Sequence, residues 1–362
     1  MFSMSTIIYV FAAILIFGFL IAIHELGHCV AAKLCGVQVN EYAIGMGPLL
    51  WQKQGKETLY SLRAFPIGGY CAMEGEDEDT GNERSFVRQK AWKKFVILVA
   101  GAFMNFLTGV VIIFILYAGA GAFLSDEITG FAEGFPLEGD DGLQVGDVFY
   151  KIDGYRTYLR GDASLFLSYH KGDTIDLTVI RDGEKIALDD FPMTRREYAG
   201  QNGETYTGFG LYVGIHREDA TFLNRIRYTW LNALDFVQLV RFSLIQLFTG
   251  GASVKDLTGP VGIVSAMTEM GEQSETAKDA IENILYFAAL LAVNLAVMNL
   301  LPFPALDGGR VLFLLLDQIS LALFHRTVPE KYQMAVNAVG MAALLTLMLF
   351  VTLHDVWKLF VK

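Results

Sequence analysis

The segment IIYVFAAILIFGFLIAIHELGHCV, residues 7–30, decides the fold class that we predict for this chain. Residues 7–23 hold no charged side chain and, as a helix, are long enough to cross most of the hydrocarbon core of a bilayer. A cleaved signal peptide would need a basic start and a small-residue cleavage site. The preceding MFSMST contains no Lys or Arg, and the apolar run continues directly into HELGH. We therefore predict a retained transmembrane helix within residues 1–36.

The composition indicates an integral membrane protein with an extramembrane module. Of the 362 residues, 53% are hydrophobic and only 19% are charged, and the apolar residues gather in runs near the two ends around a polar middle. The net charge of -11 argues against a nucleic-acid partner, which usually requires a basic face. The three cysteines form no CxxC pair, so they indicate neither a disulfide framework nor a zinc ribbon.

Three further apolar runs bring the predicted number of transmembrane helices to four. They are expected within residues 95–120, 281–324 and 333–358. Small residues and the lone Asn105 in the second run indicate a face that packs against other helices. Residues 221–249 are also apolar but carry four charges, so we predict amphipathic membrane-surface helices within residues 216–280. A fifth span in this segment is the alternative.

Two polar segments separate these helices. Residues 37–94 are rich in Lys and Arg, which predicts a cytoplasmic loop and an N-terminus outside. Its β-branched and aromatic residues with glycine-rich turns predict membrane-associated β-hairpins. Residues 124–215 contain strand–turn units such as TIDLTVIRDGEKIAL (174–188), which predict an inserted extracytoplasmic β-rich domain.

The HELGH string at residues 24–28 is the most informative motif for chemistry. On a helix, His24 and His28 lie one turn apart on the same face and can reach one ion, while Glu25 can act on a water at that ion. Two imidazoles and one carboxylate suit Zn²⁺ with an open fourth position. Incidental polar residues are the alternative, but each ionisable group at the bilayer centre costs on the order of 3 kcal/mol.

A third metal ligand is expected from NLLPFPALDGG, residues 299–309. Asp307 follows the third apolar run, and Pro302 and Pro304 break the helix before it. The topology places Asp307 at the same membrane depth as HELGH. Asn294 and Asn299 in the same run either hydrogen-bond other helices or grip the backbone of a locally unwound substrate.

Three motifs together resemble the site-2 protease family of intramembrane zinc metalloproteases. They are HELGH, GAFMNF at residues 101–106, and NLLPFPALDGG. The central GLQVGD and KIDG strings look like a PDZ domain, and GPVGIV at residues 259–264 is similar to the bacterial RseP-type branch. The segment 124–215 holds only one PDZ-like unit, unlike the members with two.

The resemblance implies zinc bound by His24, His28 and Asp307, with Glu25 as the catalytic base. It implies a polytopic α-helical protein of the bacterial inner membrane with a PDZ-like extracytoplasmic domain. The implied substrates are single-span membrane proteins, such as pre-cleaved anti-sigma factors or remnant signal peptides. From their place in and after the third apolar run, we predict that Asn294, Asn299, Pro302 and Pro304 contact the substrate. A catalytically inactive PDZ-bearing scaffold and a zinc transporter are the alternative classes.

Overall fold

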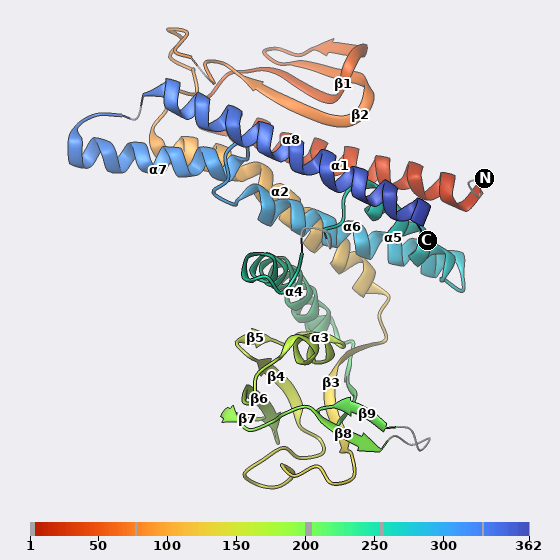
Figure 1. The fold of residues 1–362 in the computed structure, drawn as a ribbon. Helices are drawn as coiled ribbons and strands as arrows, with labels where there is room; N and C mark the ends of the chain where they lie inside the picture. The colour runs from red at the N-terminus through yellow and green to blue at the C-terminus, as the bar shows by residue number, and fades with distance from the viewer. Residues whose placement is uncertain (1–3, 77, 200–204, 254–256, 328, 362) are drawn as a thin grey trace. The chain divides into compact units, whose positions relative to one another are not determined.

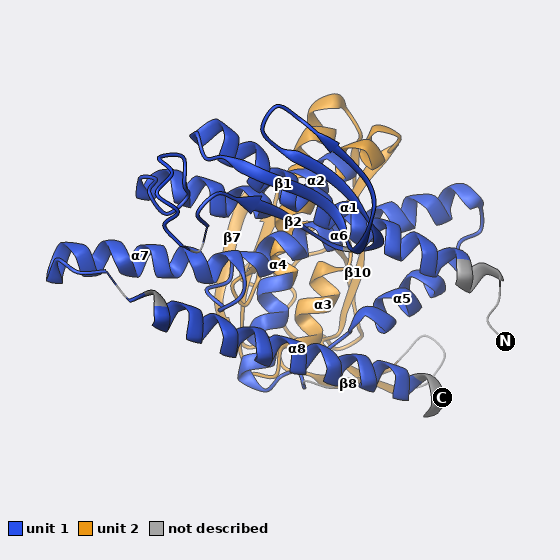
Figure 2. Ribbon diagram, turned by 90° about the horizontal axis from the view of Figure 1, so that it is seen from above, with its two compact units in different colours: residues 1–112, 240–362 blue, residues 113–239 orange. Residues whose placement is uncertain are grey.

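The computed structural model describes residues 4–361 except 77, 200–204, 254–256 and 328 (Figure 1). The chain divides into two compact units, which Figure 2 shows in different colours. The first unit comprises residues 1–112 and 240–362, and the second comprises residues 113–239. The second unit is thus inserted into the first, as the polar middle of the sequence predicts.

Long apolar helices form most of the first unit. They are α1 (Met4–Cys35), α2 (Ala91–Ala118), α5 (Pro260–Glu272), α6 (Ala277–Asn299), α7 (Asp307–Phe324) and α8 (Glu330–Val361). Helix α4 (Phe222–Thr249) begins in the second unit and ends in the first. Among the described residues, α1, α2, α4, α6 and α8 are long and apolar enough to cross a membrane. Helix α4 meets this criterion despite its charges, so it is a candidate for the fifth span that the sequence left open.

Small residues allow the helices of the first unit to approach closely. A Cβ at Gly27 of α1 would collide with the carbonyl oxygen of Ala100 in α2. A Cβ at Gly109 of α2 would lie 2.7 Å from the side chain of Val293 in α6. Helix α1 therefore packs against α2, and α2 against α6, as small residues in membrane helices usually permit.

The predicted hairpin region contains β1 (Val39–Gln54) and β2 (Leu59–Met73), which pair in antiparallel fashion. Both strands bend, so residues 39–44 pair on one side with 59–62 and on the other with 69–73. Residues 49–54 add to the far side of 59–62. The segment 69–73 is consequently an edge of this small sheet, since no other described strand pairs with it.

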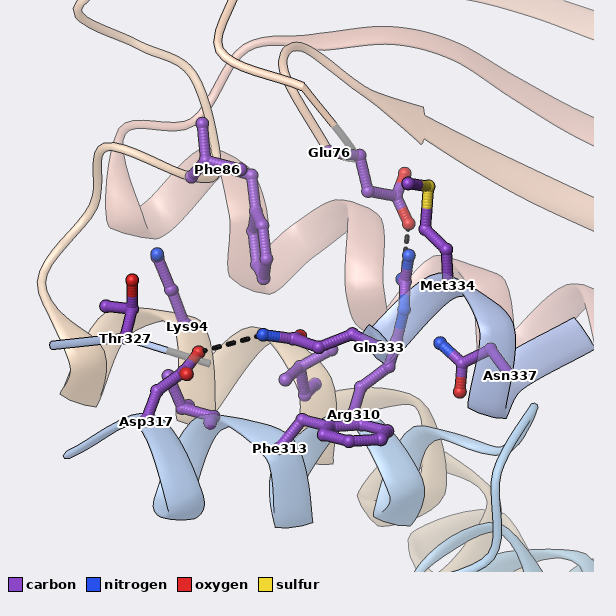
Figure 3. Close-up of a pocket in the computed structure, with 13 residues that line it drawn as sticks. Glu76, Phe86, Lys94, Arg310, Phe313, Asp317, Thr327, Gln333, Met334 and Asn337 are labelled. Carbon is purple, nitrogen blue, oxygen red and sulfur yellow. Dashed lines mark hydrogen bonds and ion pairs between the residues drawn. The ribbon is translucent and has the colours of Figure 1, made fainter. Parts of the chain in front are cut away.

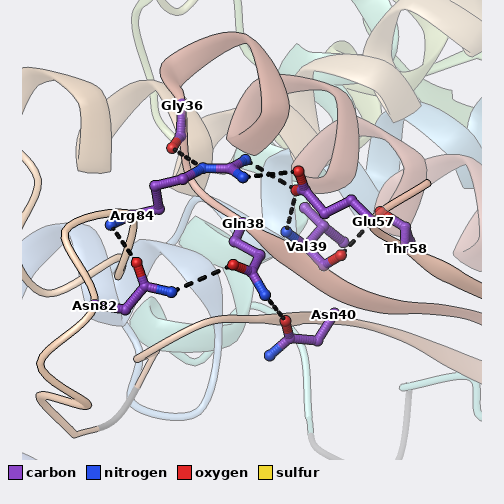
Figure 4. A network of polar contacts seen from close by, with 8 residues as sticks. All are labelled: Gly36, Gln38, Val39, Asn40, Glu57, Thr58, Asn82 and Arg84. Carbon is purple, nitrogen blue, oxygen red and sulfur yellow. Dashed lines mark hydrogen bonds and ion pairs between the residues drawn. The ribbon is translucent and has the colours of Figure 1, made fainter.

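A polar network ties this sheet to the loop that follows it (Figure 4). Arg84 donates to both carboxylate oxygens of Glu57 in the β1–β2 turn, at 2.8 and 3.0 Å. Asn82 donates to Gln38, which in turn donates to Asn40. The charged loop after β2 is therefore held against the sheet rather than projecting from it.

The segment 281–324, where we predicted the third span, contains two helices on either side of the break expected at Pro302 and Pro304. Helix α6 ends at Asn299, and α7 begins afresh at Asp307. Pro302 cannot donate the hydrogen bond that a continuing helix needs, and Ala305 adopts a positive φ of 75°. The close packing of Gly308 and Gly309 on the carbonyls of Leu300, Leu301 and Phe303 then permits a sharp restart.

The second unit contains the β-rich domain that the sequence predicts at residues 124–215. Its main sheet has the strand order β10-β3-β4-β6-β7, with β5 paired to β4, and β8 and β9 form a separate pair. The elements are β3 (Ala122–Phe131), β4 (Val148–Ile152), β5 (Tyr155–Arg156), α3 (Asp162–Tyr169), β6 (Ile175–Arg181), β7 (Glu184–Phe191), β8 (Arg196–Ala199), β9 (Thr205–Gly208) and β10 (Leu211–Asp219). Apolar side chains such as Ile128, Ile152 and Val179 form its buried core.

Candidate metal centre

Three donor atoms converge at the junction of α1 and α7. Asp307 Oδ2 lies 3.1 Å from His24 Nε2 and 3.3 Å from His28 Nε2. The two Nε2 atoms are 3.2 Å apart. Ligands about 2.0 Å from a tetrahedral zinc ion are separated by about 3.3 Å, so this triangle has the size of one face of such a site. Among the described residues, this is the group of His, Cys, Asp and Glu side chains that could hold a metal.

The local chain explains how the three ligands meet. His24 and His28 occupy one face of α1 because residues four apart are neighbours on a helix. Asp307 is the first residue of α7, directly after the break, so its carboxylate points from a helix start rather than from a helix side. Asp307 Oδ2 is buried and accepts no hydrogen bond of good geometry. A buried carboxylate oxygen in that state calls for a cation.

Side chains and carbonyls behind the histidines orient their rings. His28 Nδ1 donates to the backbone carbonyl of Ile97 at 2.8 Å, so the ring proton lies on Nδ1. The unprotonated Nε2 faces Asp307 and can bind a metal. His24 Nδ1 lies 3.4 Å from the side-chain amide of Asn105 and 3.5 Å from that of Asn299. Both imidazoles are thus presented through Nε2. The sequence predicted neither Ile97 nor Asn105 as a site residue.

Glu25 lines the same cavity, whose volume is about 360 Å³. The backbone amide of Cys71 lies beside the Glu25 carboxylate. The edge segment of β2 supplies Tyr70, Cys71, Ala72 and Met73 to this cavity. Glu25 therefore shares one cavity with the three donor atoms and with the strand edge.

The four residues predicted to contact substrate are not among those that line this cavity. Asn294 and Asn299 lie half-buried on α6, and Asn299 reaches His24 as described. Pro302 is exposed in the break, and Pro304 packs against Gly340 of α8. The structure therefore gives Asn299 a contact with the metal centre that the sequence did not predict.

A second cavity of about 320 Å³ adjoins the first (Figure 3). Glu76, Leu98 and Arg310 line both cavities, and an ion pair joins Arg310 of α7 to Glu76 of the loop after β2. Glu76 belongs to the acidic run EGEDED, residues 74–79, and nothing in the sequence distinguishes Glu76 from its acidic neighbours. The ion pair links the helix of the third candidate ligand to the strand that lines the site.

Comparisons with known proteins define the class. Residues 12–347 match the model of peptidase family M50. A Clostridium perfringens protein called a "putative zinc metalloprotease" is 35% identical over 96% of this chain and 98% of its own length. The "Regulator of sigma-W protease RasP" of Bacillus subtilis is 27% identical over 97% of this chain and 99% of its own length. The "Zinc metalloprotease RasP" of Shouchella clausii is 28% identical, over 96% and 99%.

A zinc metalloprotease with several apolar helices is therefore the class that fold, site and relatives define. The chain belongs to peptidase family M50, the site-2 protease family. The family resemblance and the zinc cofactor predicted from the motifs are confirmed.

Proposed function

We propose that His24, His28 and Asp307 hold the zinc ion and that Glu25 is the catalytic base. The observation that carries this assignment is the triangle of donor atoms, with sides of 3.1, 3.2 and 3.3 Å. Its donor chemistry, two imidazoles and one carboxylate, is that of catalytic zinc sites with an open position.

In peptide hydrolysis, the zinc ion and the side chains around it would have separate roles. When bound, zinc supplies Lewis acidity that polarises a carbonyl group and acidifies water. Glu25 takes the proton from the attacking water and returns it to the leaving nitrogen, as a positioned carboxylate can do. The neighbouring backbone amide of Cys71 would orient the Glu25 carboxylate for both transfers. His28 keeps its orientation through the Ile97 carbonyl.

The edge segment 69–73 supports binding of an extended substrate. A peptide that adds to this open edge would pass beside Glu25, since Tyr70 to Met73 line the catalytic cavity. A transmembrane substrate must unwind locally before its peptide bonds are accessible. We assign Asn294 and Asn299 to its freed backbone groups, and we expect Pro302 and Pro304, in the adjacent helix break, to contact the substrate as well.

The substrate class we propose is the single-span membrane protein, cleaved within or beside its transmembrane segment. Anti-sigma factors already cut once and remnant signal peptides are the favoured examples, and the name of the Bacillus subtilis relative supports regulation of a sigma factor. The protein would reside in the bacterial inner membrane, with the PDZ-like β domain extracytoplasmic and acting as a size filter or docking site. It would need a lipid bilayer and no nucleic acid.

The test is cleavage of a tagged single-span protein by the full chain in lipid vesicles. The Glu25→Gln protein should bind one zinc ion per chain yet release no fragment. Glu83→Gln, an exposed carboxylate in the loop after β2, serves as the matched control and should cleave normally. Undiminished cleavage by the Glu25→Gln protein would refute the mechanism.

A further inference from the structure

One stripe of α2 lies behind both histidines. Ile97, Gly101 and Asn105 are spaced four residues apart and so share a helix face. The carbonyl of Ile97 contacts His28, and the side chain of Asn105 contacts His24. Between them, a Cβ at Gly101 would collide with His28 Nε2 and lie 2.7 Å from His24 Cε1. Glycine at this position is what brings the other two residues into reach.

We propose that Asn105 is a positioning residue that accepts a hydrogen bond from His24 Nδ1–H and thereby fixes the tautomer that binds zinc through Nε2. His24 Nε2 faces Asp307 and His28, so the ring proton must reside on Nδ1 when a metal is bound. That N–H is buried, because only 9% of His24 is exposed, and it needs an acceptor.

The side-chain amide of Asn105 can supply this acceptor. Asn105 is 1% exposed, and its Oδ1 has no hydrogen-bond partner. Its Nδ2 is the atom placed 3.4 Å from His24 Nδ1. The two ends of an asparagine amide are nearly identical in shape, and the hydrogen-bond network decides which one faces a neighbour. Rotating the amide by half a turn puts Oδ1 opposite the Nδ1–H and gives the oxygen its partner.

Asn299 is the competing acceptor, and the geometry favours Asn105. Asn299 lies slightly farther from His24 Nδ1, at 3.5 Å, and its side chain is only partly buried. Asn299 is also at the last residue of α6, beside the break. Asn105 instead sits in the middle of α2, held by the same close packing that aligns Ile97 with His28. Helix α2 therefore sets the orientation of both imidazoles.

The inference rests on the zinc site proposed above, and it is tested by metal affinity rather than by proteolysis. Zinc is titrated into the detergent-solubilised full chain against a fluorescent chelator. Replacing a hydrogen-bond partner of a zinc ligand typically weakens metal binding about 10- to 100-fold, which is the loss we expect for Asn105→Leu. Asn105→Asp keeps an acceptor of the same shape and should bind zinc within about threefold of the wild type.

Thr108→Val is the matched control on α2. Its hydroxyl donates to the Met104 carbonyl of its own helix, so its loss should leave zinc affinity unchanged. Equal affinity of the Asn105→Leu and wild-type proteins would overturn the inference, as would equal losses in the Leu and Asp variants. A loss in Asn299→Leu alone would transfer the role to Asn299. If His24→Ala binds zinc normally, the proposed zinc site itself fails, which separates the two conclusions.

Discussion

Asn337 of α8 accepts a hydrogen bond from the backbone N–H of Ala305, at 3.3 Å, two residues before Asp307. Ala305 has a φ of 75°, a left-handed conformation that is unfavourable for a residue with a side chain. Gly340, three residues farther along α8, packs directly on Pro304. Helix α8 thus stabilises the strained turn that delivers the proposed third zinc ligand.

We predict that Asn337→Ala weakens zinc binding about 10-fold, since the turn before Asp307 loses the contact that fixes it. Gln333, one turn earlier on α8, donates to Asp317 of α7 (Figure 3). Gln333→Ala is therefore the control and should keep wild-type affinity. Competition with a fluorescent chelator measures both proteins, and equal affinities would show that the turn holds without Asn337.

Gly101→Ala should reduce zinc affinity more than 100-fold. The added methyl group would collide with His28 Nε2, one of the three proposed ligand atoms, and α2 can avoid it only by moving away from α1. Gly119→Ala, just beyond the end of α2, serves as the control, since its new methyl group would meet the Leu116 carbonyl oxygen at an ordinary contact distance of 4.0 Å. Zinc content after dialysis, with circular dichroism as a check on folding, distinguishes the outcomes. A zinc-loaded Gly101→Ala protein would contradict the packing seen here.

The sequence predicted those parts of the candidate site that depend on local spacing. His24 and His28 follow from helical periodicity, and Asp307 follows from its place after a predicted span. The Ile97 carbonyl and the Glu76–Arg310 pair depend on how distant elements approach, and no periodic pattern marks them. The sequence showed Asn105 as a lone polar residue in an apolar run. Only the packing of α1 against α2 shows that its side chain faces His24.

Whether helix α4 spans the membrane was also not predictable from the sequence. Its charges argued for a position on the membrane surface, because an unpaired charge is costly in lipid. Within the second unit, however, Arg227 pairs with Glu218 at 3.0 Å, and Arg225 donates to the Ala120 carbonyl. Asp235 is 3% exposed. Because Arg225 and Arg227 have polar partners within the protein, their charges do not by themselves exclude a span, and the composition of α4 did not distinguish a surface helix from a spanning one.

Asp355 of α8 caps the start of α5 from a distant part of the chain. Its Oδ2 accepts the backbone N–H groups of Gly259 and Gly262, both at 2.9 Å. Gly259 has no side chain to cap the helix, so Asp355→Ala leaves two helix-start donors without their acceptor. We expect a loss of about 2 kcal/mol in the free energy of unfolding.

Denaturant titration of the detergent-solubilised chain measures the effect of Asp355→Ala. Thr346→Ala on the same helix is the control, since its hydroxyl donates only within α8, to Ala342. Asp355→Asn keeps a neutral acceptor and should fall between the wild type and the alanine variant. An unchanged midpoint for Asp355→Ala would mean that water replaces the carboxylate at no cost.

Asp162 in α3 should make the β-rich domain less stable as the pH rises. Burial raises the pKa of this carboxyl to about 6, although the N–H groups of Leu159 and Tyr158 lower it, and the charge of Asp126 adds repulsion. The folded state therefore holds the proton more tightly than the unfolded chain. Its stabilising effect is complete below about pH 4 and is lost as the pH rises through about 6, by up to about 3 kcal/mol.

Hydrogen exchange of the α3 amides in the full chain, corrected for intrinsic rates, measures this change between pH 4 and pH 7. Protection should fall over that interval in the wild type and stay nearly level in Asp162→Asn, which cannot ionise. Asp173→Asn removes an exposed carboxylate after α3 and should retain the wild-type slope. Equal slopes for the wild-type and Asp162→Asn proteins would assign the pH dependence to other carboxylates, of which Asp126 and Asp235 are the nearest candidates.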